Sequence, residues 1–272
     1  MAQKVIYTVL TGGYDRLEQP AAVSPDWDYI CFGDSEGQDG VWKLRTIPFE
    51  GTPVMRARWA KMHPHILLPE YEYSVFMDAN LLICAPEFYS ALLQEQKQPF
   101  LLFTTCSSTQ PGAKSADIGL LRVLEHPERD CVWEELRYCF LKDKVSTGTA
   151  VKWHRYLRKM CMPRHLGLAE TNIIAREHNN LQIIALDNLW WQFLEKTGGS
   201  RDQLAFTPAL HRTGLNPSLL FGPGLNARNV PFVKYVNHPV KGPQNQPGKL
   251  NWANLQYNIR LLWRKAVLLC LR

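Results

Sequence analysis

The stretch that decides the fold is Tyr71-Glu72-Tyr73-Ser74-Val75-Phe76-Met77-Asp78-Ala79-Asn80-Leu81-Leu82-Ile83. Its consecutive apolar residues Val75 to Met77 predict a strand that is buried on both faces. Asp78 ends this run, and a carboxylate in that position needs a hydrogen bond, an ion pair or a metal. Asn80 adds a neutral oxygen, so the pair can place two oxygens on one divalent cation, or one on the cation and one on a sugar hydroxyl. Asp-x-Asn also occurs in plain turns, so the motif alone leaves both interpretations open.

The composition indicates a folded, mildly basic chain. Its 272 residues are 46% apolar, which suits one large domain or two small ones. The net charge of +6 suits polyanionic small ligands or an anionic membrane surface, and it does not by itself indicate a nucleic-acid binder. Seven scattered cysteines without a Cys-x-x-Cys pair argue against a zinc site and a disulfide framework. We find no signal peptide or membrane span, and therefore expect a cytoplasmic protein.

Two strands are expected before the Asp78 motif, and each ends in residues suited to a ligand. Residues 4–10 run into Thr11-Gly12-Gly13, where the backbone can approach a ligand closely or form an ordinary tight turn. Residues 28–33 are followed by Asp34, which can accept from a ribose hydroxyl or a base edge, or cap a turn. A third strand is expected at an edge, over residues 42–47. Neither GxGxxG nor a P-loop occurs, so a dinucleotide fold and a P-loop NTPase are not supported.

A basic cluster precedes the Asp78 strand. Thr52-Pro53 predicts the start of a helix, because threonine is a good N-cap and proline suits the first helical position. Arg58 and Lys61, with Arg56 nearby, lie away from its apolar face. These cations can clamp a diphosphate, or they can form a solvated basic face.

In the first half of the chain, strands alternate with helices, which predicts an α/β fold with a mainly parallel central sheet flanked by helices. Asp187 is expected to cap one of the later helices. The remaining expected elements are strands over residues 99–105 and 230–236, and helices over residues 127–142, 150–160 and 188–196.

The last part of the chain has a different composition. His238 follows the late strand and is a candidate metal ligand, although a lone histidine is usually a simple hydrogen-bonded residue. Residues 239–248 predict a linker. Residues 251–272 predict an amphipathic helix with Arg264 and Lys265 away from its apolar face. That helix suits an anionic membrane surface, or packing on its own domain or on a partner subunit. We expect one domain over residues 1–240, followed by the linker and helix over residues 241–272.

Several blocks of the sequence resemble the domain of unknown function 616 family, which holds glycosyltransferase-like proteins of plants and bacteria. The likeness covers roughly residues 4–212 and implies a GT-A fold, which is a nucleotide-sugar-binding α/β domain with an Asp-x-Asp-like metal motif. Asp78-Ala79-Asn80 takes the place of that motif, and Asn80 removes its second acid. The blocks are, in order, Arg56–His65, Pro69–Asn80, His126–Asp130 with Glu134-Glu135, Gly167–Thr171, Trp190-Trp191 and Arg201–Phe206.

The resemblance implies transfer of a sugar from a nucleotide-sugar, with a UDP-sugar as the expected donor, to a glycan or lipid-linked acceptor. The expected setting is bacterial surface polysaccharide synthesis, in the cytoplasm or on the inner face of the cell membrane. The residues expected to hold the nucleotide-sugar are Thr11, Gly12, Gly13, Asp34, Arg56, Arg58, Lys61, Asp78 and Asn80. The expected ligands of Mn2+ or Mg2+ are Asp78, Asn80 and His238.

Two carboxylates, Asp202 and Glu170, are the catalytic candidates at the acceptor side. One of them takes the acceptor's proton in an inverting enzyme, or stabilises an oxocarbenium-like centre in a retaining one. His126, Arg129 and Asp130 either line the acceptor pocket or form a network at the start of a helix. A catalytically inactive module that binds a glycan or a partner protein is the alternative, which Asn80 favours slightly. A nucleic-acid partner is not expected, because no known motif or concentrated basic patch is visible.

Overall fold

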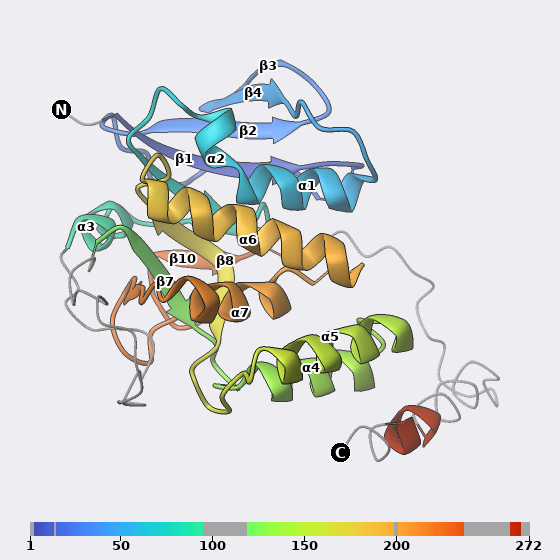
Figure 1. Cartoon of the computed structure of the whole chain (residues 1–272). Helices are drawn as coiled ribbons and strands as arrows, with labels where there is room; N and C mark the ends of the chain where they lie inside the picture. Colours follow the sequence, from blue (N-terminus) through green and yellow to red (C-terminus); the bar gives the residue numbers. More distant parts are fainter. Residues whose placement is uncertain (1–2, 14, 95–118, 199–200, 237–261, 268–272) are drawn as a thin grey trace, which may run out of the picture.

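The computed structural model describes residues 3–13, 15–94, 119–198, 201–236 and 262–267. In this part of the chain, eight strands form one sheet in the order β3-β4-β2-β1-β5-β8-β7-β9, and β10 pairs with β6 in a second sheet (Figure 1). The strands are β1 (Lys4–Leu10), β2 (Asp28–Gly33), β3 (Gly37–Asp39), β4 (Trp42–Thr46), β5 (Tyr73–Met77), β6 (Leu81–Ile83), β7 (Leu121–Glu125), β8 (Ala169–Arg176), β9 (Ser218–Leu219) and β10 (Val233–Tyr235). The helices of seven residues or more are α1 (Pro53–Met62), α3 (Glu87–Leu93), α4 (Val132–Leu141), α5 (Thr147–Lys159), α6 (Leu181–Thr197) and α7 (Gln203–Thr213), and α2 (Pro64–Leu67) is a single turn.

The large sheet is mainly parallel and is flanked by helices, as predicted for an α/β fold. β1 pairs in parallel with β2 and β5, and β2 pairs in parallel with β4. β8 lies antiparallel between β5 and β7, and β3 is antiparallel to β4. The carboxyl ends of β1, β2 and β5 therefore meet at one edge, where ligands bind in open α/β sheets.

β8 places polar side chains inside the sheet. All eight of its residues are buried, and its polar run Glu170-Thr171-Asn172 lies beside the end of β5. The pairing of β7 with β8 shifts register between Val123 and Leu124, and such an irregularity re-aims side chains next to it. β8 thus brings three polar residues to the edge where Asp78 lies.

The sheet separates two cores. On one face, α1, α6 and α7 cover the strands (Figure 1), and α4 and α5 contribute to the same hydrophobic cluster. On the other face, α3 and the β6–β10 sheet cover the strands. Examples from the first cluster are Tyr7, Met62, Phe76, Trp190 and Leu210, and examples from the second are Trp27, Val75, Ile83, Phe88 and Val233.

Some sequence-based boundaries were wrong. Asp187 does not cap a helix: it lies inside α6, which begins after Asn180, and it is fully buried against Arg176. α4 begins at Val132 rather than at residue 127. β4 is not the edge strand, because β3 pairs along its outer side. For Asp187, the ion pair with the distant Arg176 is a tertiary contact that no local pattern reveals.

Several predicted features fall outside the described residues. They are the strand over residues 99–105, the linker, His238 and most of the C-terminal helix. Because the linker and most of that helix are among them, the division at residue 240 stays a prediction. Residues 262–267 are described, and within them Arg264, which was predicted to lie away from the apolar face of the helix, is only 8% exposed. Within the described ranges, no helix has the length and apolar character that a bilayer crossing requires.

Candidate active site at the carboxyl ends of the strands

Asp78 lies in a turn that is held on two sides. Its backbone N–H donates to the carbonyl oxygen of Asn172 in β8 (2.8 Å), and its own carbonyl accepts from Leu81 (3.0 Å). The carbonyl oxygen of Asn80 accepts from the N–H of Val236, just after β10 (2.8 Å). The Asp78 side chain is 38% exposed. The turn therefore presents this carboxylate at the sheet edge in a fixed position.

Lys61, near the end of α1, is the buried cation of the site. It is 2% exposed, and its Nζ lies 2.6 Å from Asp202 Oδ2 and 3.9 Å from Asp78 Oδ1. It also donates to Thr171 Oγ1 at 3.2 Å, and Arg58 lies 3.4 Å from the same Asp202 oxygen. Two of the three predicted cations, Arg58 and Lys61, thus meet two predicted carboxylates, and Lys61 is not part of a solvated basic face.

The environment shifts the pKa values of Asp78 and Asp202 in opposite directions. For Asp202, burial raises the pKa, but Arg58 and Lys61 outweigh it and hold the pKa well below its usual range. For Asp78, desolvation raises the pKa above its ordinary value, and Lys61 and Arg58 offset only part of this. The carboxylates of Asp202 and Asp15 raise it further. Asp202 therefore stays ionised, and Asp78 binds a proton more readily than an exposed aspartate.

Glu170 forms a second polar group close to the first. It is buried and pairs with Arg228, while its Oε2 has no hydrogen-bond partner among the described residues. Asn172, two positions along the strand, donates to the hydroxyl of Tyr235. Burial raises the pKa of Glu170, and the Arg228 guanidinium offsets part of this rise. The Asn172 side chain also lowers this pKa, but the net shift is upward, and a buried carboxylate with a raised pKa can accept a proton.

The residues predicted to hold the nucleotide gather around the turn after β1. Gly12 has φ +64°, and its N–H donates to Asp34 Oδ2 at 2.8 Å. Arg56 pairs with Asp34, and the Thr11 hydroxyl donates to the carbonyl oxygen of Pro53 at 2.8 Å. These contacts join the ends of β1 and β2 to the start of α1. They bring the predicted residues together and fix the shape of the turn.

Three further predicted residues lie before α4. The His126 Nδ1 accepts from the N–H of Arg129 (3.1 Å), and Arg129 Nε donates to the buried Glu135 at 2.7 Å. Asp130 pairs with the exposed His165. These contacts are those of a network at the start of a helix, and an additional contact with the acceptor stays a prediction.

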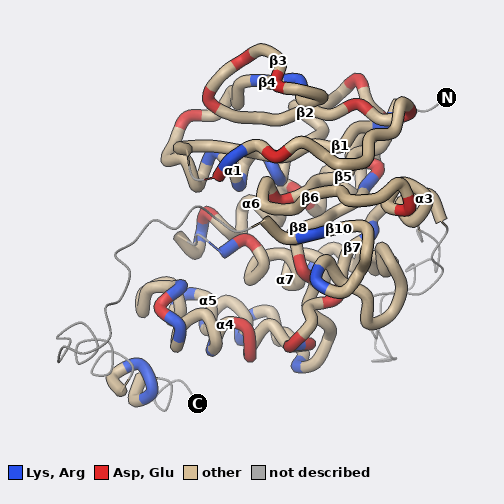
Figure 2. The backbone as a smooth tube through the Cα atoms, turned by 180° about the vertical axis from the view of Figure 1, so that it is seen from behind, with Lys and Arg blue, Asp and Glu red and all other residues tan. Residues whose placement is uncertain are grey.

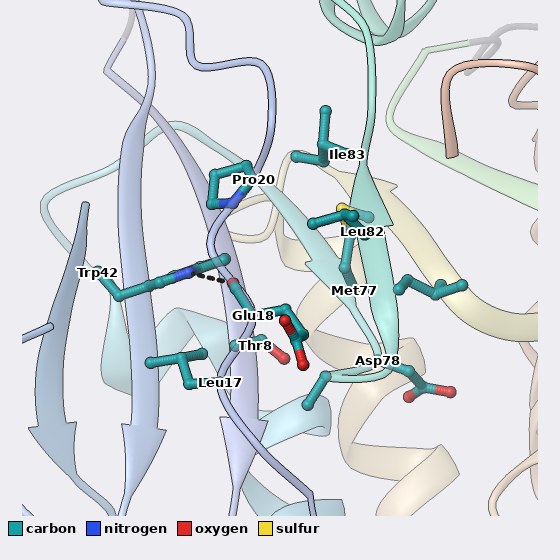
Figure 3. Close-up of a pocket in the computed structure, with 11 residues that line it drawn as sticks. Thr8, Leu17, Glu18, Pro20, Trp42, Met77, Asp78, Leu82 and Ile83 are labelled. Atoms are coloured by element: carbon teal, nitrogen blue, oxygen red, sulfur yellow. Dashed lines mark hydrogen bonds between the residues drawn. The ribbon is translucent and has the colours of Figure 1, made fainter. Parts of the chain in front are cut away.

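A hollow lies on the face of β5 opposite to α1, between β1, β4 and the β5–β6 turn. Thr8, Glu18, Trp42 and Leu82 line it, and Trp42 donates to the Glu18 carbonyl oxygen at 2.9 Å. Figure 3 shows the Asp78 carboxylate at its rim, pointing away from it. The hollow therefore adjoins the candidate site at Asp78, whose carboxylate points to the other side.

The described residues alone do not form a metal site. No three His, Cys, Asp or Glu side chains within the described ranges are arranged to hold a metal ion, and the ammonium of Lys61 already lies near Asp78. His238, the third predicted ligand, lies outside the described residues. Binding of Mn2+ or Mg2+ therefore stays a prediction.

Sequence reasoning missed several residues of the site. Asn172 could have been found, because three consecutive polar residues precede Ile173 in a segment that is otherwise apolar. Arg228 and Tyr235 follow no local pattern that marks them. A supporting layer was also missed: Arg176 pairs with Asp187 at 2.7 Å and donates to the carbonyl oxygen of Lys61. This pair fixes the end of α1 against β8.

Two solved glycosyltransferases resemble this fold. The WbbM bifunctional glycosyltransferase, in its apo form, is 9% identical in sequence to this chain, with a TM-score of 0.37. The match covers 76% of this chain and 38% of WbbM. Mouse xyloside xylosyltransferase 1, also in its apo form, has 9% identity and a TM-score of 0.40, covering 80% of this chain and 84% of that one. No protein-family model and no curated sequence match the chain. Similarity this remote does not assign a reaction, which has to come from the residues themselves.

Proposed function

We propose that the chain is a glycosyltransferase that moves a sugar from a nucleotide-sugar to a hydroxyl acceptor. The supporting observation is the convergence of Arg58, Lys61, Asp78, Asp202 and Glu170 at the carboxyl ends of the strands. Environments that push the pKa values of neighbouring carboxylates apart give them different roles in acid–base chemistry. Asp202, with its lowered pKa, holds charge, and Glu170, with its raised pKa, moves a proton.

On the donor side, Arg58 and Lys61 offset the negative charge that grows on the leaving nucleoside diphosphate. Fixed cations in a site largely shielded from water stabilise such charge without having to reorganise during the reaction. Arg58 is 25% exposed at its side chain and can reach a ligand, while Lys61 is held by Asp202 and Thr171. The turn at Gly12, fixed by Asp34, gives the nucleotide an open backbone surface. A UDP-sugar remains the expected donor.

On the acceptor side, Glu170 acts as the general base. As the acceptor oxygen attacks the anomeric carbon, its proton passes to the Glu170 carboxylate. The bond from that carbon to the diphosphate breaks, and the electron pair leaves with the nucleoside diphosphate. This single displacement inverts the anomeric centre. Asp202 is a poorer base, because Lys61 and Arg58 stabilise its ionised form.

The acceptor and the cofactor belong to the same proposal. A glycan or lipid-linked acceptor in bacterial surface polysaccharide synthesis is the expectation that the family resemblance supplies. Dependence on Mn2+ or Mg2+ would require His238 or the substrate's own oxygens to complete the ligands of Asp78 and Asn80. The competing candidate is an inactive binding module, which the neutral Asn80 favours.

A thermal-shift panel of UDP-, GDP-, CMP- and dTDP-sugars, each with and without Mn2+, tests the proposal. A donor at 100 times its Kd stabilises the native state by about 2.7 kcal/mol, which raises Tm by roughly 5 °C or more. Sugar release from the same donor should be lost in Asp78→Asn. The control is Glu177→Gln, which removes an exposed carboxylate just beyond Arg176, at the end of β8 that is far from Asp78, and should keep the activity. Absence of both a shift and sugar release with every donor would favour the inactive module.

A further inference from the structure

α5 is an amphipathic helix whose outward face is entirely cationic. Its sequence, TGTAVKWHRYLRK, contains no acid. Trp153 and Leu157 are buried against the core, while Lys152, Arg155 and Lys159 are exposed. Their spacing of three and four residues places these three cations on one face, opposite the buried one.

The positive charge of the chain is concentrated around this helix. Residues 132–165 contain eight Lys and Arg against three Asp and Glu, a net charge of +5 out of +6 for the whole chain. Of the three acids, Glu135 is buried and Asp143 pairs with Arg264. Figure 2 shows basic residues along α5 and on the C-terminal helical segment. The net positive charge of the chain therefore arises largely from this region.

Residues 262–267 are attached beside this surface. Arg264 donates to the carbonyl oxygens of Phe140 and Val145, at the end of α4 and in the α4–α5 turn. Its guanidinium lies 4.7 Å from the centre of the Phe140 ring. With Arg264 inserted in this way, Leu262 and Trp263 remain 66% and 53% exposed. Two large apolar side chains thus stand near the α4–α5 turn, which leads directly into the cationic helix.

We propose that the face formed by Lys152, Arg155, Lys159, Leu262 and Trp263 docks onto an anionic lipid bilayer. Cations alone would suit any polyanion, but exposed tryptophan and leucine beside them are typical of segments that lie in a membrane interface. The cations meet the negative headgroups, and the two apolar side chains enter the boundary with the acyl chains. The docking surface is composite, because α5 supplies the charge and the C-terminal segment supplies the apolar contact.

Co-sedimentation of the full chain with lipid vesicles tests this proposal, using pure phosphatidylcholine or phosphatidylcholine with 30% phosphatidylglycerol, in 0.1 and 0.5 M NaCl. We expect binding only to the anionic vesicles, and weaker binding at the higher salt. Arg155→Glu with Lys159→Glu should weaken binding at least tenfold. Trp263→Ser should weaken it several-fold at both salt concentrations. The control pair Lys43→Glu with Lys234→Glu makes the same change in net charge at exposed strand positions and should bind within twofold of the wild type.

Three results would overturn the proposal. Equal binding to neutral and anionic vesicles would remove the role of the cations. An equal loss in the control pair would show an effect of net charge alone. Binding to vesicles that is unchanged in Trp263→Ser and abolished by excess heparin would identify a surface for soluble polyanions instead. All substituted side chains are exposed, and unchanged circular dichroism and Tm would show that each variant is folded.

Discussion

Replacing Lys61 and Asp202, singly and together, separates the structural role of this ion pair from its role in the reaction. Their charged atoms lie 2.6 Å apart, and both side chains are less than one-tenth exposed. At an effective dielectric constant of about 20, the attraction over this distance is about 6 kcal/mol before the cost of desolvation. Removing one partner of a buried pair usually costs about 3–5 kcal/mol, because the other charge is left uncompensated.

The structure sets different costs for the two single variants. Asp202→Asn leaves the Lys61 ammonium with only the partly exposed Asp78 carboxylate, 3.9 Å away, so we expect a loss of about 4 kcal/mol. Lys61→Met leaves Asp202 with Arg58 at 3.4 Å, so a loss of about 2 kcal/mol is expected. The double variant leaves neither charge stranded and should cost about 4 kcal/mol instead of the sum of about 6, a coupling of about 2 kcal/mol.

Urea unfolding of the four proteins measures this cycle, and donor binding measures the function. We expect the double variant to recover stability relative to the sum of the single changes, but not to bind the donor. The reasoning would be refuted by additive losses in the free energy of unfolding, or by a double variant with wild-type transfer activity. The low pKa of Asp202 also predicts how the free energy of unfolding changes with pH. Its ionised form stabilises the fold above the unfolded pKa of about 4, so this contribution is lost as the pH falls through the folded pKa and the wild type approaches Asp202→Asn.

Three other changes have definite expected outcomes. Glu170→Gln should lower kcat by about 10²–10⁴ and remove the acidic limb of the pH–rate profile. Burial raises the pKa of Glu170, so this limb should lie above the ordinary glutamate pKa. An acidic limb that persists in the variant would assign the base elsewhere. Asp187→Asn strands a fully buried arginine and should cost about 3–5 kcal/mol in urea unfolding, whereas a loss below about 1 kcal/mol would show that this pair does not hold the end of α1. Gly12→Ala should lower Tm more than Gly13→Ala, because both glycines have positive φ but only the first would place its Cβ 2.9 Å from a proline ring; equal losses would exclude that contact as the cause.

The sequence allowed prediction of those parts of the fold that local patterns determine. β1, β2 and β5 are contiguous apolar runs, and each ends in residues whose type marks the sheet edge. The helix with Arg58 and Lys61 begins at a good N-cap, whose hydroxyl does accept from Met55 N–H. These features depend on neighbours within a few positions, so they are visible without a structure.

The remainder depends on contacts between distant positions. Lys61 and Asp202 are 141 residues apart in the chain, and Tyr7 and Arg176 are 169 apart. Asp187 looked like a helix cap because aspartate favours that position, but its buried arginine partner overrides the preference. β8 runs against its neighbours, and no local pattern gives the direction of a strand. The polar groups that β8 contributes to the site were therefore only partly predictable.

The burial of Lys61 is itself an argument for function. The double variant of Lys61→Met and Asp202→Asn loses stability because it keeps a polar amide at a buried position. Well-packed apolar residues in place of a buried ion pair are instead often neutral or stabilising by about 1–4 kcal/mol, so stability alone does not explain why this chain keeps the pair. The surrounding residues nevertheless hold it firmly: Thr171 accepts from the ammonium, and Tyr7 and Arg176 both donate to the Lys61 carbonyl oxygen. An arrangement that fixes a costly charge beside two carboxylates at the edge where ligands bind is best explained by a ligand with growing negative charge. A diphosphate leaving group has that property, and a neutral glycan bound by an inactive module does not.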